Sequence, residues 1–346
     1  MSITGRFNWR SALVGAGLLL AGFLPAGRAA TTTLTLGTLA PEGTSYHKAL
    51  LQMRDQWRAA SGGSVNLRIY AGGKIGGDAK MVGQMRLGAL DAGLLTSVGL
   101  MDIEQAVTGL QIMPMMLRSL DEMDYVSEKL APTLEKKIEA KGFLVLFWAD
   151  TGWVRFFSKE PMLRPGDLRK MKMFTWAGDQ KAVKLWKSGG FQPVPLETAD
   201  IVPMLDTGLI NAVPAPPVAA LANLIYERAP HMLELNWAPL VGALVIRKAA
   251  WDKIPADVRV QLVKAAVETG KTMKAHGRAE SERSGKAMEG KGLKVHKVTP
   301  ELDAEWRKAA EEFYSRIKGN MVPAEIWDEV QRHLQDYRAA QDKTKP

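Results

Sequence analysis

A period-two alternation of apolar and polar residues predicts the first strands of the chain. Leu34 and Leu36 stand between polar residues, and residues 65–69 repeat this pattern. A further strand is predicted at residues 92–96. Residues 143–148 are almost continuously apolar, which is typical of a strand that is buried on both faces.

Apolar residues at helical spacing separate these strands and predict three helices with one inward face each. The inward residues are Tyr46, Ala49, Leu50, Met53 and Trp57 in the first helix, Met81, Val82 and Met85 in the second, and Val126, Leu130, Leu134 and Ile138 in the third. Strands that alternate with helices in this order predict a parallel sheet covered by helices, so the predicted fold class is α/β.

The second half of the chain continues this style without repeating the sequence. The predicted strands are residues 153–158, 171–176, 240–247 and 293–298, and the predicted shorter helices are 179–188 and 199–207. A helix from residue 255 to about 286 is too long for one compact lobe, so we expect it to span two. We predict one lobe from residues 30–151 and about 242–285, and a second from residues 152–241 and about 286–340, joined by several crossings of the chain.

Residues 1–29 have the three parts of a secretory signal peptide. Arg6 and Arg10 precede an apolar run at residues 12–24, and Gly27, Ala29 and Ala30 supply small residues for cleavage. The apolar run is shorter than the roughly 20 residues that span a bilayer, and no Cys follows it to carry a lipid anchor. We therefore predict export to the periplasm, with an uncleaved signal anchor as the alternative.

The charge of the chain does not indicate a nucleic-acid partner. Arg6, Arg10 and Arg28 of the predicted signal peptide account for part of the formal charge of +9, and without them it would be +6. The remaining excess lies on helices such as residues 264–291, where acidic residues are interleaved. Nucleic-acid binding needs basic residues clustered with stacking aromatic side chains.

No catalytic constellation is visible in the sequence. The chain contains no Cys, and its five His residues are scattered without metal-ligand spacing. The Gly-rich segment at residues 72–77 lacks the Gly-Lys-Ser/Thr of a phosphate-binding loop, so it indicates a tight strand-to-helix turn. We therefore predict a protein that is not an enzyme and that needs no metal or cofactor.

Seven short segments occur in an order that resembles a known family. They are GTLAP (37–41), SGGSV (61–65), YAGGKIGGD (70–78), MRLGALD (85–91), MPMMLRS (113–119), PGDLR (165–169) and MLDTGLIN (204–211). The chain resembles the extracytoplasmic solute-binding subunit of tripartite ATP-independent periplasmic (TRAP) transporters, the DctP family. The resemblance implies a two-lobed periplasmic-binding-protein-like fold, cleft closure on a small ligand, membrane partner subunits and a monomeric state.

Three positions depart from the family pattern. The resemblance implies an Arg that grips a substrate carboxylate at Phe174, a second basic residue at Val154 and an Asn at Ala215. Because Phe cannot replace an Arg–carboxylate fork, we predict a more apolar or aromatic ligand, a monocarboxylate included. Arg155 would substitute for the missing arginine only if the strand register shifted, since strand alternation points it to the opposite face.

The predicted site combines an aromatic wall with a few hydroxyl groups. Its residues are Phe174, Trp176, Trp153, Arg155, Thr96, Ser97, Pro214, Ala215, Trp237 and Tyr46. The aromatic residues suit a ring or an acyl chain, and Thr96 and Ser97 would donate hydrogen bonds from the end of a first-lobe strand. Two other functions remain open at this point: a ligand sensor for a membrane receptor, and a secreted hydrolase or isomerase on a similar scaffold.

Overall fold

The computed structural model describes residues 31–344, and the predicted signal peptide lies outside the described residues. A five-stranded sheet has the strand order β2-β1-β3-β10-β4. Its strands are β1 (Thr32–Thr38), β2 (Val65–Tyr70), β3 (Ala92–Thr96), β4 (Phe143–Trp153) and β10 (Pro239–Arg247). The predicted parallel pairing holds for β1 with β2 and β3, whereas β10 pairs antiparallel with both β3 and β4. The sheet is therefore mixed, because β10 returns from the second half of the chain.

Helices predicted from the apolar spacing accompany the first sheet. They are α1 (Ser45–Ala60), α2 (Asp78–Leu87) and α4 (Leu120–Glu139). The structure adds a short helix that was not predicted, α3 (Ser97–Ile103), followed by a 3-10 turn η1 (Gln105–Leu110). The inward faces predicted for α1, α2 and α4 are all buried. Thr44 caps α1 by accepting a hydrogen bond from the amide of His47, and Ser119 caps α4 in the same way at Glu122.

A six-stranded sheet has the order β11-β9-β5-β8-β6-β7. Its strands are β5 (Arg155–Ser158), β6 (Lys172–Trp176), β7 (Gln192–Leu196), β8 (Ala212–Ala215), β9 (His231–Leu233) and β11 (Lys294–His296). The helices that belong with it are α5 (Pro165–Arg169), α6 (Gln180–Ser188), α7 (Ile201–Asp206), α8 (Pro217–Ala222), α9 (Ile225–Arg228) and α12 (Pro300–Ile317).

Three predicted boundaries were wrong. Trp153 belongs to the end of β4 and β5 begins at Arg155, because β4 continues past residue 148 and pairs with β10 as far as Pro239. The helix predicted at residues 199–207 is a 3-10 turn, η2 (Thr198–Asp200), followed by the short α7. The strand predicted at residues 293–298 is shorter, because β11 covers only residues 294–296.

Two neighbouring segments connect the sheets. The chain passes from β4 through Val154 directly into β5, and from β9 through Ala238 into β10. The amide of Val154 donates to the carbonyl of Ala238 over 2.9 Å, so the two connecting segments are hydrogen-bonded to each other. These two connections match the hinge strands that the family resemblance implies.

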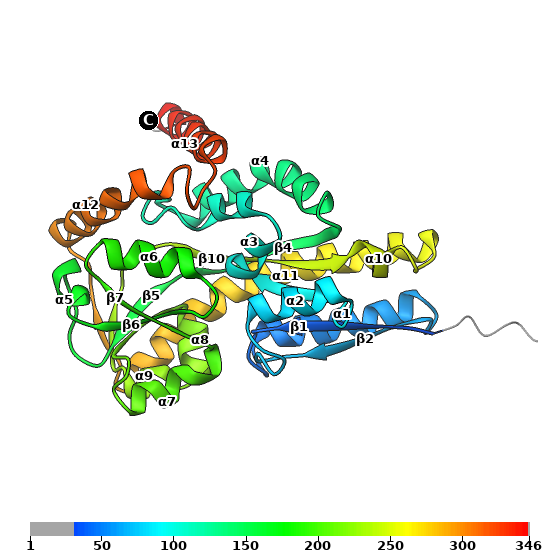
Figure 1. The fold of residues 1–346 in the computed structure, drawn as a ribbon, viewed down its shortest axis with the longest axis horizontal. Coiled ribbons are helices and arrows are strands. Elements are labelled where there is room, and N and C mark those ends of the chain that lie inside the picture. The colour runs from blue at the N-terminus through cyan, green and yellow to red at the C-terminus, as the bar shows by residue number, and fades with distance from the viewer. Residues whose placement is uncertain (1–30, 345–346) are drawn as a thin grey trace, which may run out of the picture. The chain divides into compact units, whose positions relative to one another are not determined.

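The long helix α11 (Ala256–Glu289) passes both sheets, as predicted (Figure 1). It packs against α1 and β4 of the first sheet and against α8 of the second. Gly277 permits a close approach to α1, since a Cβ atom there would lie 2.4 Å from the Tyr46 ring. The fold class predicted from the sequence is confirmed.

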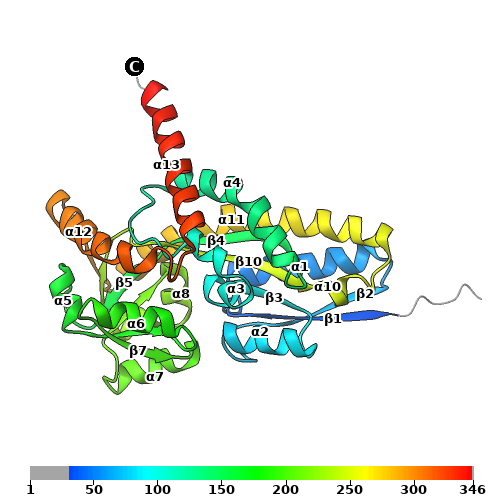
Figure 2. The ribbon, with the colours of Figure 1, turned by 45° about the horizontal axis from the view of Figure 1, so that its top comes forward.

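The C-terminal helices complete the described chain. α12 packs against α5 and α6, and α13 (Ala324–Thr344) packs against α4 and projects at its C-terminal end (Figure 2). Arg338 of α13 forms an ion pair with the buried Glu122 of α4 over 2.7 Å. The short α10 (Lys248–Trp251) links β10 to α11. Among residues 31–344, no helix is both long and apolar enough to cross a membrane.

Candidate functional site

A cleft between the two sheets contains two adjoining chambers. The first chamber holds roughly 970 Å³ and the second roughly 1010 Å³, space open to solvent included. Five residues line both chambers and stand between them: Phe174, Trp176, Pro214, Pro216 and Leu240. Phe174 and Trp176 come from β6, and their rings meet edge to face with centroids 5.2 Å apart. The strand that the resemblance marks as ligand-contacting therefore faces the centre of the cleft.

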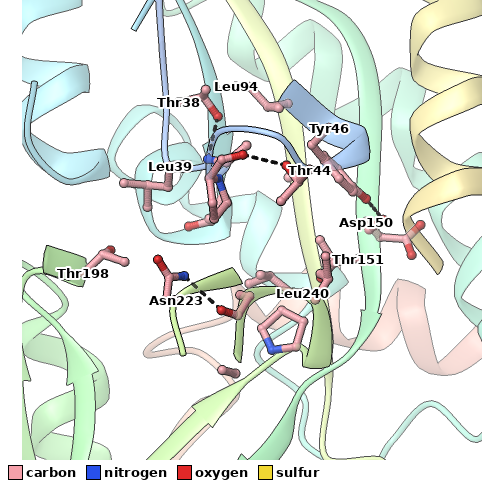
Figure 3. A pocket seen from close by; sticks show the side chains of 18 of the residues that line it. Thr38, Leu39, Thr44, Tyr46, Leu94, Asp150, Thr151, Thr198, Asn223 and Leu240 are labelled. Carbon is pink, nitrogen blue, oxygen red and sulfur yellow. Dashed lines mark hydrogen bonds between the residues drawn. The ribbon is translucent and has the colours of Figure 1, made fainter. Parts of the chain in front are cut away.

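The first chamber lies between the start of α1 and the turns around α8 and η2 (Figure 3). Thr38, Thr44 and Asn223 face it, but each already hydrogen-bonds within its own turn. The hydroxyl oxygens of Thr151 and Thr198 are buried and have no partner among the described residues. Thr151 comes from β4 and Thr198 from the second-sheet side, so two free hydroxyl groups face the chamber from opposite walls.

Tyr46 lines the first chamber, but its hydroxyl group is already occupied. It donates a hydrogen bond to the backbone carbonyl of Asp150 (Figure 3). Burial and the negative charge of Asp150 raise the pKa of Tyr46 well above its usual value. Tyr46 therefore offers a ring edge to a ligand and stays protonated.

The carboxylate of Asp150 is neutralised by Arg278, a residue that does not itself line either chamber. Its side chain is 3 % exposed, and Arg278 of α11 binds it through two hydrogen bonds of 2.7 and 2.8 Å. The same guanidinium binds Asp124 of α4 over 3.0 and 2.6 Å. Burial alone would raise the pKa of Asp124, but hydrogen bonds from Arg278 and Lys274 outweigh it and hold the pKa below its usual value. This cluster joins β4, α4 and α11 beside the hinge.

The second chamber is lined by apolar residues, five of which are aromatic, and by a few polar residues. Its aromatic lining residues are Phe174, Trp176, Trp186, Trp237 and Phe313. Trp186 of α6 stacks on Trp237 at 5.6 Å and meets Phe313 of α12 edge to face at 5.8 Å. The polar groups that line it are Ser97, Gln111, Thr175 and Asp179.

Eight of the ten predicted site residues line the cleft. Tyr46, Thr96 and Ala215 line the first chamber, Ser97 and Trp237 the second, and Phe174, Trp176 and Pro214 both. Trp153 and Arg155 line neither chamber and face a separate hollow beside α11. Trp153 packs in the core, and the Arg155 guanidinium donates to Asn236.

The strand alternation around Val154 explains where Arg155 points. Val154 lines the second chamber, whereas Arg155 is buried on the opposite face, where burial lowers its pKa. A register shift would be needed to bring this arginine into the cleft, and the pairing of Arg155 with Ala215 shows no such shift.

Several cleft residues were not among the predicted site residues. Trp186 and Asp179 were predicted only as members of the helix at residues 179–188. Thr151 and Thr198 carry no sequence signal, because only the tertiary fold reveals that their hydroxyl groups lack partners.

A family model decides the relationship of this chain. The model of the bacterial extracellular solute-binding protein family 7, DctP, matches residues 36–320. The chain belongs to this family. Its similarity to the C4-dicarboxylate-binding periplasmic protein DctP of Rhodobacter capsulatus is 24% identity over 270 residues, which covers 76% of this chain and 80% of the relative.

Solved structures of DctP-family proteins have the same fold. A TRAP periplasmic solute-binding protein from Xanthobacter autotrophicus, with bound β-D-galacturonate, has a TM-score of 0.80 at 20% identity and covers 87% of this chain and 99% of its own. A second TRAP periplasmic solute-binding protein, from Ralstonia eutropha with bound (S)-2-acetolactate, has a TM-score of 0.82 at 18% identity. It covers 88% of this chain and 99% of its own. A third, from Shewanella oneidensis with bound succinate, has a TM-score of 0.82 at 16% identity. It covers 88% of this chain and 100% of its own.

The DctP-family relationship confirms the recognition made from the seven sequence segments. The chain is a TRAP-type extracytoplasmic solute-binding protein, a class that binds small ligands, works with membrane subunits and is not enzymatic. Membership implies a periplasmic location.

The ionisable carboxyl groups in the described lining of the cleft have no cationic side chain beside them in that lining. None of the described residues that line either chamber is Lys or Arg. The acidic lining residues are Asp150, which Arg278 neutralises, and Asp179, for which the described residues provide no ion pair.

Thr96 reaches the first chamber, but its hydroxyl group donates to the buried carboxylate of Asp78. Burial raises the pKa of Asp78 to about 6, although the hydrogen bonds from Thr96 act in the opposite direction. The folded protein therefore holds a proton that the unfolded chain releases near pH 3.8. This contribution to stability is complete below that pH and is lost as the pH rises through about 6.

Replacing Asp78 with Asn is expected to remove this pH dependence. Relative to the unchanged protein, the free energy of unfolding of Asp78→Asn should rise by about 2.5 kcal/mol between pH 4 and pH 8, at about 1.4 kcal/mol per pKa unit. Urea unfolding at both pH values measures the change, with Asp55→Asn on the exposed face of α1 as the control. A difference that does not vary with pH would contradict the prediction.

Proposed function

We propose that this protein captures a small ligand with an apolar or aromatic body by closing its cleft, and passes it to the membrane subunits of a TRAP transporter. We further propose that it acts as a monomer after removal of residues 1–29. Its two lobes would be residues 30–151 with about 242–285, and 152–241 with about 286–340. The division of the strands into two sheets supports these lobes.

The absence of a cation from the described cleft lining carries the proposal on ligand class. The solved relatives hold galacturonate, acetolactate and succinate, all of which carry carboxylate groups. A carboxylate that loses its water without a cationic partner pays heavily for desolvation. In this chain Phe174 is 1 % exposed and packs in the second-sheet core, and Val154 also faces the cleft.

Contacts between the two sides of the cleft support closure as the mechanism. A Cβ atom at Gly77, which caps α2, would lie 2.4 Å from a carboxylate oxygen of Glu197, which precedes η2. A Cβ atom at Gly178 would lie 3.1 Å from that of Ala79. Such contacts require the two sides of the cleft to lie close together, and a ligand that binds both sides shifts the open–closed equilibrium toward this closed arrangement.

Native mass spectrometry of the purified mature protein tests the proposal, followed by denaturation to release any bound compound. We expect a compound with an apolar or aromatic body. Isothermal titration should then show binding of aromatic probes such as 2-phenylethanol, and no binding of succinate or D-galacturonate. Release of a dicarboxylate or sugar acid, or tight binding of either control acid, would overturn the proposed ligand class.

A further inference from the structure

The second chamber contains buried hydroxyl groups that have no partner. Ser97 is 0 % exposed and Thr175 is 6 % exposed, and both line this chamber. Neither hydroxyl oxygen has a hydrogen-bond partner among the described residues. A buried polar group without a partner is costly, so such groups mark positions where a bound molecule completes the hydrogen bonding. Ser97 comes from the first-sheet side and Thr175 from the second.

A buried carboxylate lies in the same chamber. Asp179 is 4 % exposed and begins α6, where one carboxylate oxygen accepts from the amide of Ala182 over 2.9 Å. The other oxygen accepts no hydrogen bond from the described residues, and no ion pair neutralises the charge. Burial raises the pKa of Asp179, the negative Asp102 raises it further, and Lys181 lowers it. Helix capping therefore accounts for only one of the two carboxylate oxygens of Asp179.

The aromatic walls of the second chamber favour positive charge. Trp176, Trp186 and Trp237 present ring faces and edges to it, beside Phe174 and Phe313. A cation near such rings gains a cation–π attraction, which increases when water is excluded. An anion in the same place would meet Asp179 and would find no Lys or Arg among the described lining residues.

We infer that the second chamber binds a protonated amine: the ligand's ammonium group lies between Asp179, Ser97 and Thr175, while its apolar or aromatic body contacts Phe174 and the tryptophans. This inference rests on the proposed function and specifies the ligand's polar end. The ammonium donates to the free oxygen of Asp179 and to the two hydroxyl oxygens, which removes every unpartnered group in this chamber at once.

Three probes that share a phenyl ring and differ in charge test the inference by isothermal titration at pH 7. They are phenethylamine, 2-phenylethanol and 3-phenylpropionate. We expect phenethylamine to bind at least tenfold more tightly than 3-phenylpropionate. Asp179→Asn should weaken phenethylamine about 10- to 100-fold, the range for a hydrogen bond to a charged group, and should leave 2-phenylethanol within about threefold.

Matched variants separate the charge from the fold. Asn caps a helix as well as Asp does, so Asp179→Asn keeps α6 intact, and the melting temperature of the ligand-free protein should not fall, because the variant removes a buried charge. Asp200→Asn removes an exposed carboxylate outside both chambers and should leave all three affinities unchanged. Thr175→Val should raise the melting temperature of the ligand-free protein and weaken phenethylamine about 2- to 10-fold, because it removes an unpartnered buried hydroxyl.

The outcomes distinguish the two proposals. Tighter binding of 3-phenylpropionate, or an Asp179→Asn variant with unchanged affinity for phenethylamine, would overturn the amine site and leave the apolar ligand class intact. Binding of succinate or D-galacturonate in preference to all three aromatic probes would overturn the ligand class itself. Failure of all three probes to bind would overturn the inference, and the compound released in mass spectrometry would then decide the proposed function.

Discussion

Replacing Arg278 with Met is expected to lower the free energy of unfolding by about 3–5 kcal/mol, the usual cost of breaking a buried ion pair from one side. Arg278 is the cation that binds the nearly inaccessible Asp150, whose side chain is 3 % exposed. Without it, the described residues provide this carboxylate with only the hydrogen bond from the amide of Gly152. Urea unfolding measures the loss.

Lys274→Met provides the matched control for this prediction. Lys274 binds Asp124 of the same cluster, but its side chain is 37 % exposed, so its removal should cost less than about 1 kcal/mol. The double variant Arg278→Met/Asp150→Asn should regain much of the lost stability, because it removes the unpaired charge. An Arg278→Met variant within 1 kcal/mol of the unchanged protein would show that the cluster contributes little.

Replacing Phe174 with Arg is expected to reverse the charge preference of the cleft. The new guanidinium would repel the ammonium of phenethylamine and occupy the carboxylate of Asp179, which lines the same chamber. Its affinity for phenethylamine should fall at least about 100-fold, since an uncompensated charge in a desolvated site costs several kcal/mol. The affinity for 3-phenylpropionate should rise, because the guanidinium provides the missing partner for a carboxylate. Isothermal titration of both probes measures the reversal.

Phe174→Leu separates this effect from a loss of packing. Phe174 is 1 % exposed and contacts the Trp176 ring, so either substitution reduces the stability of the second-sheet core. Leu introduces no charge and should weaken both probes by less than about tenfold, without changing their order. A gain in carboxylate binding cannot come from an unfolded protein. Retention of tight phenethylamine binding by Phe174→Arg would therefore contradict the proposed binding of phenethylamine in the second chamber, with its ammonium at Asp179 and its ring against Phe174.

The sequence predicted the parts of the fold that depend on local periodicity. The inward residues of α1, α2 and α4 follow from helical spacing, and all of them are buried. The sequence also predicted a helix that passes two lobes, because α11 is too long for one. Its boundaries failed where tertiary pairing extends an element: β4 continues to Trp153 because β10 lies beside it.

The candidate site also has features that the sequence predicted and features that only the structure shows. Phe174 and Trp176 were predicted through the family resemblance, and the alternation of Val154 and Arg155 correctly placed the arginine on the opposite face. The free hydroxyl groups of Ser97, Thr175, Thr151 and Thr198 could not be identified as unpartnered, because a hydrogen-bond partner comes from residues distant in the sequence.

The sequence by itself determined the α/β class, the two-lobed order of elements and the membership in the solute-binding family, since each depends on short-range patterns and motif order. Only the tertiary structure decided the electrostatics of the cleft. It buried Asp179 without an ion pair from the described residues, neutralised Asp150 through Arg278 and turned Arg155 away from the cleft. The reason is physical: the free energy of a charge depends on its burial and on its partners in space, and neither is encoded in the spacing of neighbouring residues.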